Sequence, residues 1–291
     1  MDTNTLAAFI AVAETRSFSQ AAQQLFITQS AISKRIALLE GQLDQKLFDR
    51  IGRRISLTEA GLALLPRAKH ILATIKDAET AMGNLTGEVR GTLSVAASHH
   101  ISLHRLPNIL RDYSQRYPDV QLNLQFDESE IAYDGVLHGD LELALITLSP
   151  NPDPAILSQP VWVDSLQYVV NQNHPLAHKP WVDLKELANY PAILPSSATF
   201  THQIVAEQFR TEGLGINVDI STNYLDTIRM MVSIGLGWSL LPETMIDASL
   251  KTLNTGSKPI QRQLGYIYHR ERTLSNAAKC LIDMLPPPES I

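Results

Sequence analysis

The stretch SFSQAAQQLFITQSAISKRIALLE, residues 17–40, constrains this chain most, because its pattern predicts two helices joined by a tight turn. Ser19 suits the N-cap of the first helix, and small apolar residues give that helix one buried face. Residues 26–28 are too few for anything but a turn, and Thr28 suits the N-cap of the second helix. With an upstream amphipathic segment at 4–14, the pattern is typical of a helix-turn-helix.

The second helix has a polar face that suits the major groove of DNA. Its side chains are hydroxyls, an amide and basic groups, all of which pair with base edges or phosphates. We expect double-stranded DNA to be bound by Thr28, Gln29, Ser30, Ser33, Lys34 and Arg35. An ordinary helical hairpin with a solvated polar face is the alternative for these residues alone.

Basic residues continue into a short predicted hairpin. Apolar and polar residues alternate on both sides of Gly52, which favours two short strands joined by a turn. Arg50, Arg53 and Arg54 lie near its tip, where they suit phosphates or the minor groove, so we predict a DNA-binding wing. Seven basic and three acidic side chains give residues 16–54 a charge of +4 in a chain of net charge −6, which concentrates the DNA footprint at one end.

With the wing included, residues 6–61 resemble the N-terminus of LysR-type transcriptional regulators. The resemblance rests on many residues at fixed spacing: Phe9, Ala13, Ser17, Phe18, Ala21, Ala22, Leu25, Thr28, Gln29, Ala31, Ile32, Ser33, Ile36, Leu39, Glu40, Leu47, Phe48, Arg50, Leu57, Thr58, Glu59, Ala60 and Gly61. Ser30 stands where the family often has Pro, and Ser is equally suited to a first helical turn. The chain length and the order of the later segments extend the resemblance to nearly all 291 residues, and it implies a DNA-binding regulator.

Residues 58–84 predict one long helix, with Thr58 as N-cap and apolar residues at steps of three and four. Pro66 lacks a backbone donor, so we expect it to kink the helix or start a fresh turn. The apolar stripe is too long to bury against a small N-terminal domain, so we expect it to pair with a second copy; packing on the chain's own C-terminal domain is the alternative. The resemblance also implies a dimerising linker, and a homotetramer. Three glycines mark a hinge after the helix: Gly83, Gly87 and Gly91.

From residue 92 onward, strands alternate with helices, which indicates sheets covered by helices on both faces. We expect two α/β lobes with a cleft between them, and the resemblance implies a periplasmic-binding-protein-like fold crossed twice, near residues 161 and 265. The predicted fold class is therefore α/β with an all-α N-terminal winged helix-turn-helix domain. The predicted domains are a DNA-binding domain at 1–58, a linker helix and hinge at 59–90, and an effector domain at 91–291, with lobe I at about 91–161 and 266–291 and lobe II at about 162–265.

Polar residues follow several predicted strands, where ligands bind in open α/β sheets. They match the effector cleft of LysR-type regulators in order and spacing, and we predict an effector site made of Ser98, His99, His100, Thr147, Thr199, Phe200, Thr201 and Tyr224. Hydroxyls and backbone N–H groups at helix N-termini suit a small anion such as a carboxylate. Helix capping is the alternative role for these hydroxyls. We expect His99 and His100 to add charge or a pH response.

The sequence also points away from several functions. It has no run of about 18 apolar residues and no basic, apolar leader after Met1, so we expect neither a membrane span nor a signal peptide, and a cytoplasmic location. A single cysteine, Cys280, forbids an internal disulfide and is expected to be a buried thiol, which argues against two-cysteine peroxide sensing. The spacing of His99, His100 and His104 does not predict a metal site, and we expect no cofactor.

No nucleophile, phosphate-loop, zinc-protease or dinucleotide motif is present, so we predict no catalytic residues and no enzyme activity. The predicted function is a transcriptional regulator controlled by a small effector. Its expected partners are double-stranded DNA, further copies of itself, and RNA polymerase if it activates. A cytoplasmic solute-binding module or an α/β enzyme with an incidental helical N-terminus is the rival hypothesis, which the acidic C-terminal body fits and the wing arginines do not.

Overall fold

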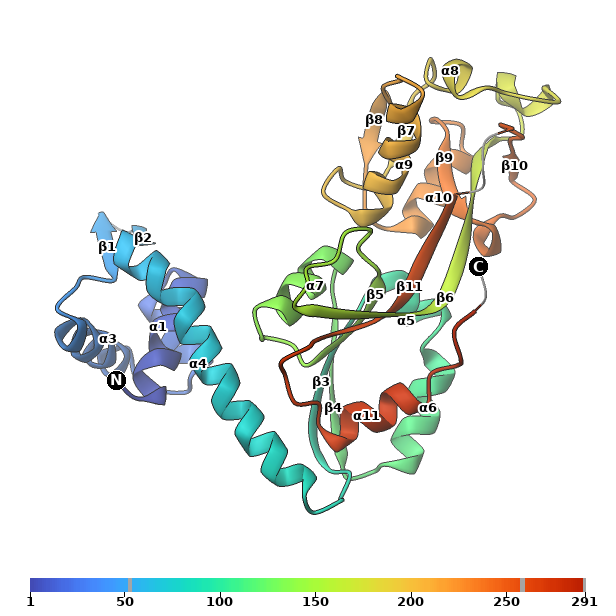
Figure 1. Ribbon diagram of the computed structural model, residues 1–291. Coiled ribbons are helices and arrows are strands. Elements are labelled where there is room, and N and C mark those ends of the chain that lie inside the picture. The colour runs from blue at the N-terminus through green and yellow to red at the C-terminus, as the bar shows by residue number, and fades with distance from the viewer. Residues whose placement is uncertain (52–53, 257–259, 290–291) are drawn as a thin grey trace. The chain divides into compact units, whose positions relative to one another are not determined.

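The computed structural model describes residues 1–51, 54–256 and 260–289 of the chain (Figure 1). The chain separates into two compact units. The first holds residues 1–88 with two short segments at 138–140 and 272–275; the second holds residues 89–137, 141–271 and 276–291.

Three helices build the N-terminal core: α1 (Thr3–Thr15), α2 (Phe18–Gln24) and α3 (Gln29–Leu43). Leu6, Phe9, Ile32 and Leu39 are almost fully buried between them. Ser17, and not Ser19, caps α2, because its side chain accepts a hydrogen bond from the Gln20 N–H at 3.3 Å. The helix begins at Phe18, which is buried in the core, and Ser19 lies exposed in the first turn.

The predicted hairpin is present as the antiparallel strands β1 (Phe48–Ile51) and β2 (Arg54–Leu57), with Phe48 opposite Leu57. Helix α4 (Glu59–Asn84) follows, and Thr58 caps it as expected: its hydroxyl accepts from the Gly61 N–H at 3.0 Å and donates to the Lys46 carbonyl at 2.6 Å. Pro66 does not start a fresh turn, because α4 runs through it as one helix.

The apolar stripe of α4 is shared between two environments. Its first half, including Leu65, Ala68 and Leu72, packs on the N-terminal core, where α4 lies against α1. The sequence-based expectation that this stripe is too long for the small domain therefore holds only for the second half. There Ile75 and Met82 are 39% and 64% exposed.

In the second unit, seven strands of the described chain form one sheet in the order β10-β6-β11-β5-β3-β4, with β9 also paired to β6. Their bounds are β3 (Gly91–Ala97), β4 (Val120–Phe126), β5 (Leu143–Thr147), β6 (Ile156–Asn171), β9 (Ser239–Pro242), β10 (Leu250–Thr252) and β11 (Ile260–His269). Strand β3 runs parallel to both β4 and β5, so the carboxyl ends of all three meet at one edge. This edge carries the candidate site.

Strands β6 and β11 form a long antiparallel pair that links the two halves of this unit (Figure 1). The sequence predicts two strands at 160–162 and 166–170, whereas β6 is a single strand spanning both. A bulge between Leu264 and Gly265 lies close to the predicted crossing near 265. A Cβ on Gly265 would stand 2.1 Å from the Gln159 carbonyl oxygen, so only glycine fits this close approach.

Helices and a small parallel sheet complete the unit. On the first half lie α5 (His99–His104), α6 (Pro107–Arg116), α7 (Ser129–Leu137) and α11 (Asn276–Asp283), of which α7 and α11 pack on the central strands. The second half holds β7 (Ala192–Leu194), β8 (Val218–Ser221), α8 (Leu184–Leu187), α9 (Phe200–Thr211), α10 (Leu225–Ser233) and the short 3-10 helices Pro175–His178 and Glu243–Met245. Its core contains Trp238 stacked on Phe209, with ring centroids 5.6 Å apart.

Cys280 in α11 is partly exposed and not fully buried. No helix in the described part of the chain is long and apolar enough to cross a membrane.

Candidate functional site

A cavity of about 430 Å³ opens at the carboxyl ends of β3, β4 and β5, opposite residues that precede or begin α9 and α10. Most of the predicted effector residues line it: Ser98, His99, His100, Thr147, Thr199, Thr201 and Tyr224. Residues outside the predicted site line it too: Phe126, Asp127, Glu128, Ser129, Glu130, Ile131, Pro195, Asn223, Leu225 and Arg262.

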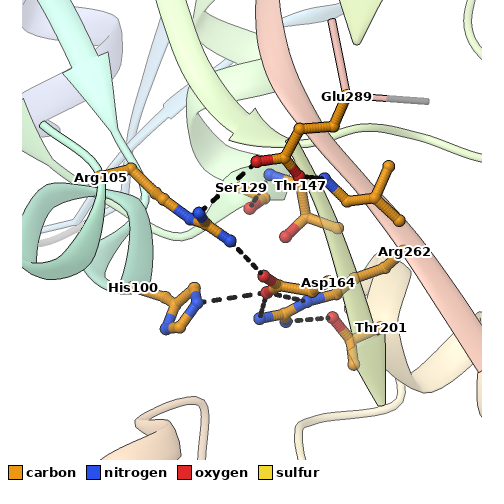
Figure 2. Close-up of polar contacts among 9 residues, drawn as sticks. His100, Arg105, Ser129, Thr147, Asp164, Thr201, Arg262 and Glu289 are labelled. Atoms are coloured by element: carbon orange, nitrogen blue, oxygen red, sulfur yellow. Dashed lines mark hydrogen bonds and ion pairs between the residues drawn. The ribbon is translucent and has the colours of Figure 1, made fainter. Parts of the chain in front are cut away.

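Two predicted hydroxyls keep their hydrogen-bonding capacity. Ser98 follows β3 and is 8% exposed, yet it makes no side-chain cap on α5 and no side-chain bond within the described residues. Thr147 ends β5 and is 6% exposed; its backbone N–H donates to the Ser129 hydroxyl at 3.1 Å, but its own hydroxyl has no described protein partner (Figure 2). Both side chains line the cavity, so their hydroxyls are available to a ligand.

The predicted residues on α9 are engaged by the protein itself. The Thr199 hydroxyl accepts from the His202 N–H at 3.2 Å and donates to the Ser196 carbonyl at 2.7 Å, which is a helix cap. The Thr201 hydroxyl accepts from Arg262 Nη1 at 3.1 Å. Phe200 does not line the cavity, because one helical step of about 100° turns its ring away, against Tyr133 with centroids 5.7 Å apart.

A buried charge cluster is centred on Asp164 of β6, whose side chain is 1% exposed (Figure 2). It reaches the cavity through His100 and Arg262. The Asp164 carboxylate accepts from Arg262 Nη2 at 2.7 Å and Nε at 3.1 Å, and from Arg105 Nη2 at 3.2 Å. Burial alone raises the pKa of Asp164, but the contact with His100 and the charge of Arg262 outweigh it and hold that pKa well below its usual range. Asp164 is therefore a fixed negative charge.

His100 does not supply the positive charge that the sequence suggests. Its Nε2 lies 3.1 Å from Asp164 Oδ2, but the alignment is not that of a hydrogen bond, and Nδ1 is also buried without a described hydrogen-bond partner. Burial, with a smaller contribution from the charge of Arg262, lowers the pKa of His100 despite Asp164. The imidazole is therefore mainly neutral near pH 7. His99 packs edge-on against Tyr224, with centroids 5.4 Å apart.

Three carboxylates enter the cavity from the loop after β4 and the start of α7: Asp127, Glu128 and Glu130. Glu128 Oε1 accepts from Asn223 Nδ2 at 2.6 Å, and Glu130 Oε1 accepts from the Phe200 N–H at 2.5 Å. Burial raises the pKa of Glu130, and its acidic neighbours add to the effect. The strand-end rule that selects Ser98 also predicts these residues, since they follow β4 as Ser98 follows β3, although the predicted site contains no residue from this loop.

The N-terminal unit presents the predicted recognition helix. Thr28 caps α3 by accepting from the Ala31 N–H at 3.2 Å. The side chains of Gln29, Ser30 and Lys34 are exposed, whereas Ser33 and Arg35 are partly buried. Of the wing arginines, Arg53 lies outside the described residues, and Arg50 and Arg54 are described only as backbone positions of β1 and β2.

Family models match both the N-terminal helix-turn-helix and the domain that contains the cavity. A model of the bacterial regulatory helix-turn-helix of the lysR family matches residues 3–62, and a model of the LysR substrate binding domain matches residues 86–286. The chain belongs to the LysR family. As a LysR-type protein it is a DNA-binding transcriptional regulator with an effector-binding domain, and the fold class expected from its sequence is confirmed.

Proteins similar to this LysR-type chain match it over nearly its whole length. The HTH-type transcriptional regulator YeiE of Escherichia coli is 31% identical over 287 residues, which is 97% of this chain and 96% of YeiE. A single-residue variant of full-length OxyR from Pseudomonas aeruginosa has a TM-score of 0.72 at 20% identity, covering 98% of this chain and 94% of OxyR. Full-length CbnR complexed with its target DNA has a TM-score of 0.63 at 21% identity, covering 98% and 99%.

Proposed function

We propose that this regulator reads base edges with the exposed N-terminal face of α3, holds the DNA backbone with its wing, and responds to a small molecule bound in the cavity. The proposed DNA-binding residues are those predicted from the sequence. The structure of CbnR with its target DNA supports this mode, because its chain has the same fold. We also propose a cytoplasmic location and, if the protein activates transcription, a contact with RNA polymerase.

The observation that carries the effector proposal is a pair of hydroxyls, those of Ser98 and Thr147, which line the cavity and have no described protein partner. Both residues are mostly buried, but their hydroxyl oxygens are open to the cavity, so a ligand can bond them in place of water. They lie at the ends of the neighbouring parallel strands β3 and β5. Two hydroxyl donors side by side suit the oxygens of a carboxylate or another anionic group, and the proposed effector carries one there.

A gel-shift assay with the DNA upstream of the protein's own gene tests the DNA half of the proposal. Gln29→Ala should weaken cognate DNA by about 1–3 kcal/mol and relax specificity, because an amide that pairs with a base edge is removed. Lys34→Ala should weaken all DNA alike and flatten the dependence of affinity on salt. If Gln29→Ala weakens cognate and unrelated DNA equally, α3 does not read bases through this side chain.

The effector half is tested with ligands found by a thermal-shift screen of metabolites. Ser98→Ala and Thr147→Val should each cost about 1.5–3 kcal/mol of affinity if their hydroxyls bond a charged group. Thr199→Ala is the matched control, because it removes a hydroxyl from the same cavity that already caps α9. Its loss should lower stability by about 1 kcal/mol and leave ligand affinity nearly unchanged. Equal affinities in all three variants would place the effector elsewhere.

We further propose that α4 dimerises the protein and that a tetramer of two dimers binds a two-fold symmetric site. The exposed apolar residues of α4 support this, since Leu62, Ile75 and Met82 are 39–64% exposed in the single chain. A soluble protein rarely leaves large apolar side chains along a helix in water without a partner.

A further inference from the structure

We propose that the effector also carries an organic cation, an ammonium or guanidinium group, held by Asp127 and Glu128. The effector class is then a zwitterion of amino-acid type or a cation, and a dicarboxylate is disfavoured. This inference rests on the proposed function, since it assigns a second group to the ligand of the same cavity.

The cavity lining carries more acidic groups than basic groups. Its lining contains three carboxylates and one guanidinium, that of Arg262. Arg262 is already paired with Asp164 and uses its remaining nitrogen on the Thr201 hydroxyl. His100 adds no compensating charge near neutral pH, because burial lowers its pKa. An entering dianion would meet carboxylates without an unpaired cation among the described lining residues, whereas an ammonium group would relieve their mutual repulsion.

Asp127 leaves β4 beside the point where Ser98 leaves β3. Ala97 and Phe126 are direct partners in the parallel pair β3–β4, so Ser98 and Asp127 leave neighbouring strands at the same level. Neighbouring strands are about 4.8 Å apart. The Asp127 carboxylate has no side-chain hydrogen bond or ion pair with any described residue, and Glu128 engages only one oxygen, with Asn223. The backbones at Ser98 and Asp127 therefore lie about one strand spacing apart, and Thr147, at the end of β5 on the other side of β3, lies about two strand spacings from Asp127. Both separations are within the span of a small zwitterion.

The first turn of α9 has backbone N–H groups of the kind that suit an anion. Glu130 already occupies it, because its Oε1 accepts the Phe200 N–H at 2.5 Å. The protein thus fills one anion position with its own carboxylate. Near Asp127 and Glu128 the lining instead includes the aromatic rings of Phe126 and Tyr224, 59% and 57% exposed. Aromatic faces attract organic cations. No group of three or more metal-binding side chains occurs in the described chain, which favours an organic cation over a metal ion.

A matched series of five-carbon probes tests the inference on the full-length protein: glutarate with two carboxylates, 5-aminovalerate with one of each group, and cadaverine with two ammonium groups. Thermal unfolding and calorimetry are run at equal concentration and ionic strength. We expect 5-aminovalerate to bind best, cadaverine next and glutarate least. In Asp127→Asn/Glu128→Gln, the affinity for both ammonium probes should fall at least tenfold while that for glutarate rises. Asp219→Asn, an exposed carboxylate of β8 outside the cavity, should keep the wild-type order.

Three results would overturn the inference: glutarate binding as well as 5-aminovalerate, no binding by either ammonium probe, or ammonium affinities that survive the double substitution. DNase footprinting with the same probes separates this failure from that of the proposed function. If glutarate binds, alters the footprint and loses affinity in Ser98→Ala, the cavity remains the effector site and only the cationic group is wrong. If a probe alters the footprint without any dependence on Ser98 or Asp127, both proposals fail.

Discussion

Asp164 shows at the scale of one residue how the effector domain holds a charge in its interior. Two arginines bond its carboxylate from different parts of the chain, Arg105 after α5 and Arg262 in β11. Taking these charges out of water is costly, and only the geometry of their pairing offsets the cost. The intact ion pairs therefore add little net stability, whereas removing one partner leaves the other charge buried without a counter-ion.

Replacing Asp164 should strongly destabilise the protein. Asp164→Asn removes the charge partner of a buried guanidinium, and breaking such a pair from one side costs about 3–5 kcal/mol. Urea unfolding followed by circular dichroism would measure it. Asp219→Asn removes an exposed carboxylate of the same domain and should leave the free energy of unfolding unchanged. Equal stability of the two variants would mean that the Arg262 charge finds another partner or water.

His100 should make stability depend on pH in a defined window. Its folded pKa lies below the ordinary value of 6.5, so below about pH 6.5 the unfolded chain binds a proton that the folded chain does not. Stability is therefore lost as the pH falls from 6.5 through the folded pKa. Asp164 does not titrate in this range, because its lowered pKa keeps it charged. Arg262 and His104 also influence His100.

The measurement compares the free energy of unfolding at pH 7.5 and pH 5.5 in wild type and His100→Gln. The wild type should lose more stability than the variant on acidification, since the other histidines are common to both proteins. Equal losses would show that the imidazole is accessible to protons in the folded state.

At the scale of elements, the start of α4 depends on a close approach to the chain before the wing. A Cβ on Gly61 would stand 2.3 Å from the Leu47 carbonyl oxygen and 2.8 Å from Leu57 Cδ2. Gly41 is also helical, in α3, but a Cβ there would meet nothing within 4 Å. The two glycines therefore form a matched pair within one domain.

Alanine substitutions at these glycines should act in opposite directions. Gly61→Ala should lower the free energy of unfolding by about 1–2 kcal/mol, because overpacking outweighs the gain in helix propensity. Gly41→Ala should raise it by about 0.5–1 kcal/mol, because glycine in a helix costs that much relative to alanine. Thermal or urea unfolding would read both. A stabilised Gly61→Ala would mean that α4 can shift away from Leu47 at no cost.

At the scale of the whole molecule, the proposed assembly depends on the second half of α4. The double substitution Ile75→Glu/Met82→Glu should shift the dimer towards monomer in sedimentation, because it places charges in the proposed apolar contact. Lys76→Ala changes an exposed polar residue of the same helix and should leave the sedimentation profile unchanged. Unaltered association in the double variant would exclude this face of α4 from the dimer contact.

Much of the N-terminal half could be predicted because its signals are local. The Thr28 and Thr58 caps each bond a backbone N–H three residues away, so a few letters of sequence suffice to identify them. The Ser19 prediction was wrong because Ser17 offers the same capping hydroxyl two residues earlier, and a helix starting there has Phe18 buried in the core. The alternation of apolar and polar residues along β4 is a signal of the same local kind, since it does not depend on the neighbouring strands.

The sequence by itself thus determined the helix-turn-helix, the long linker helix and the α/β character of the remainder, and the family to which these belong. Only the tertiary structure decided which polar residues of the cavity are free. Thr199 and Ser98 have the same hydroxyl chemistry, yet one caps α9 and the other has no described side-chain partner. The charge of the cavity also depends on the tertiary structure. Asp164 pairs with Arg105 and Arg262, which are distant from it in sequence, so the unpaired charges of the described lining are the carboxylates of the β4–α7 loop. The physical reason is that helix caps and periodicity act within one or two turns of chain, whereas burial, ion pairing and pKa depend on which distant segments the fold brings together.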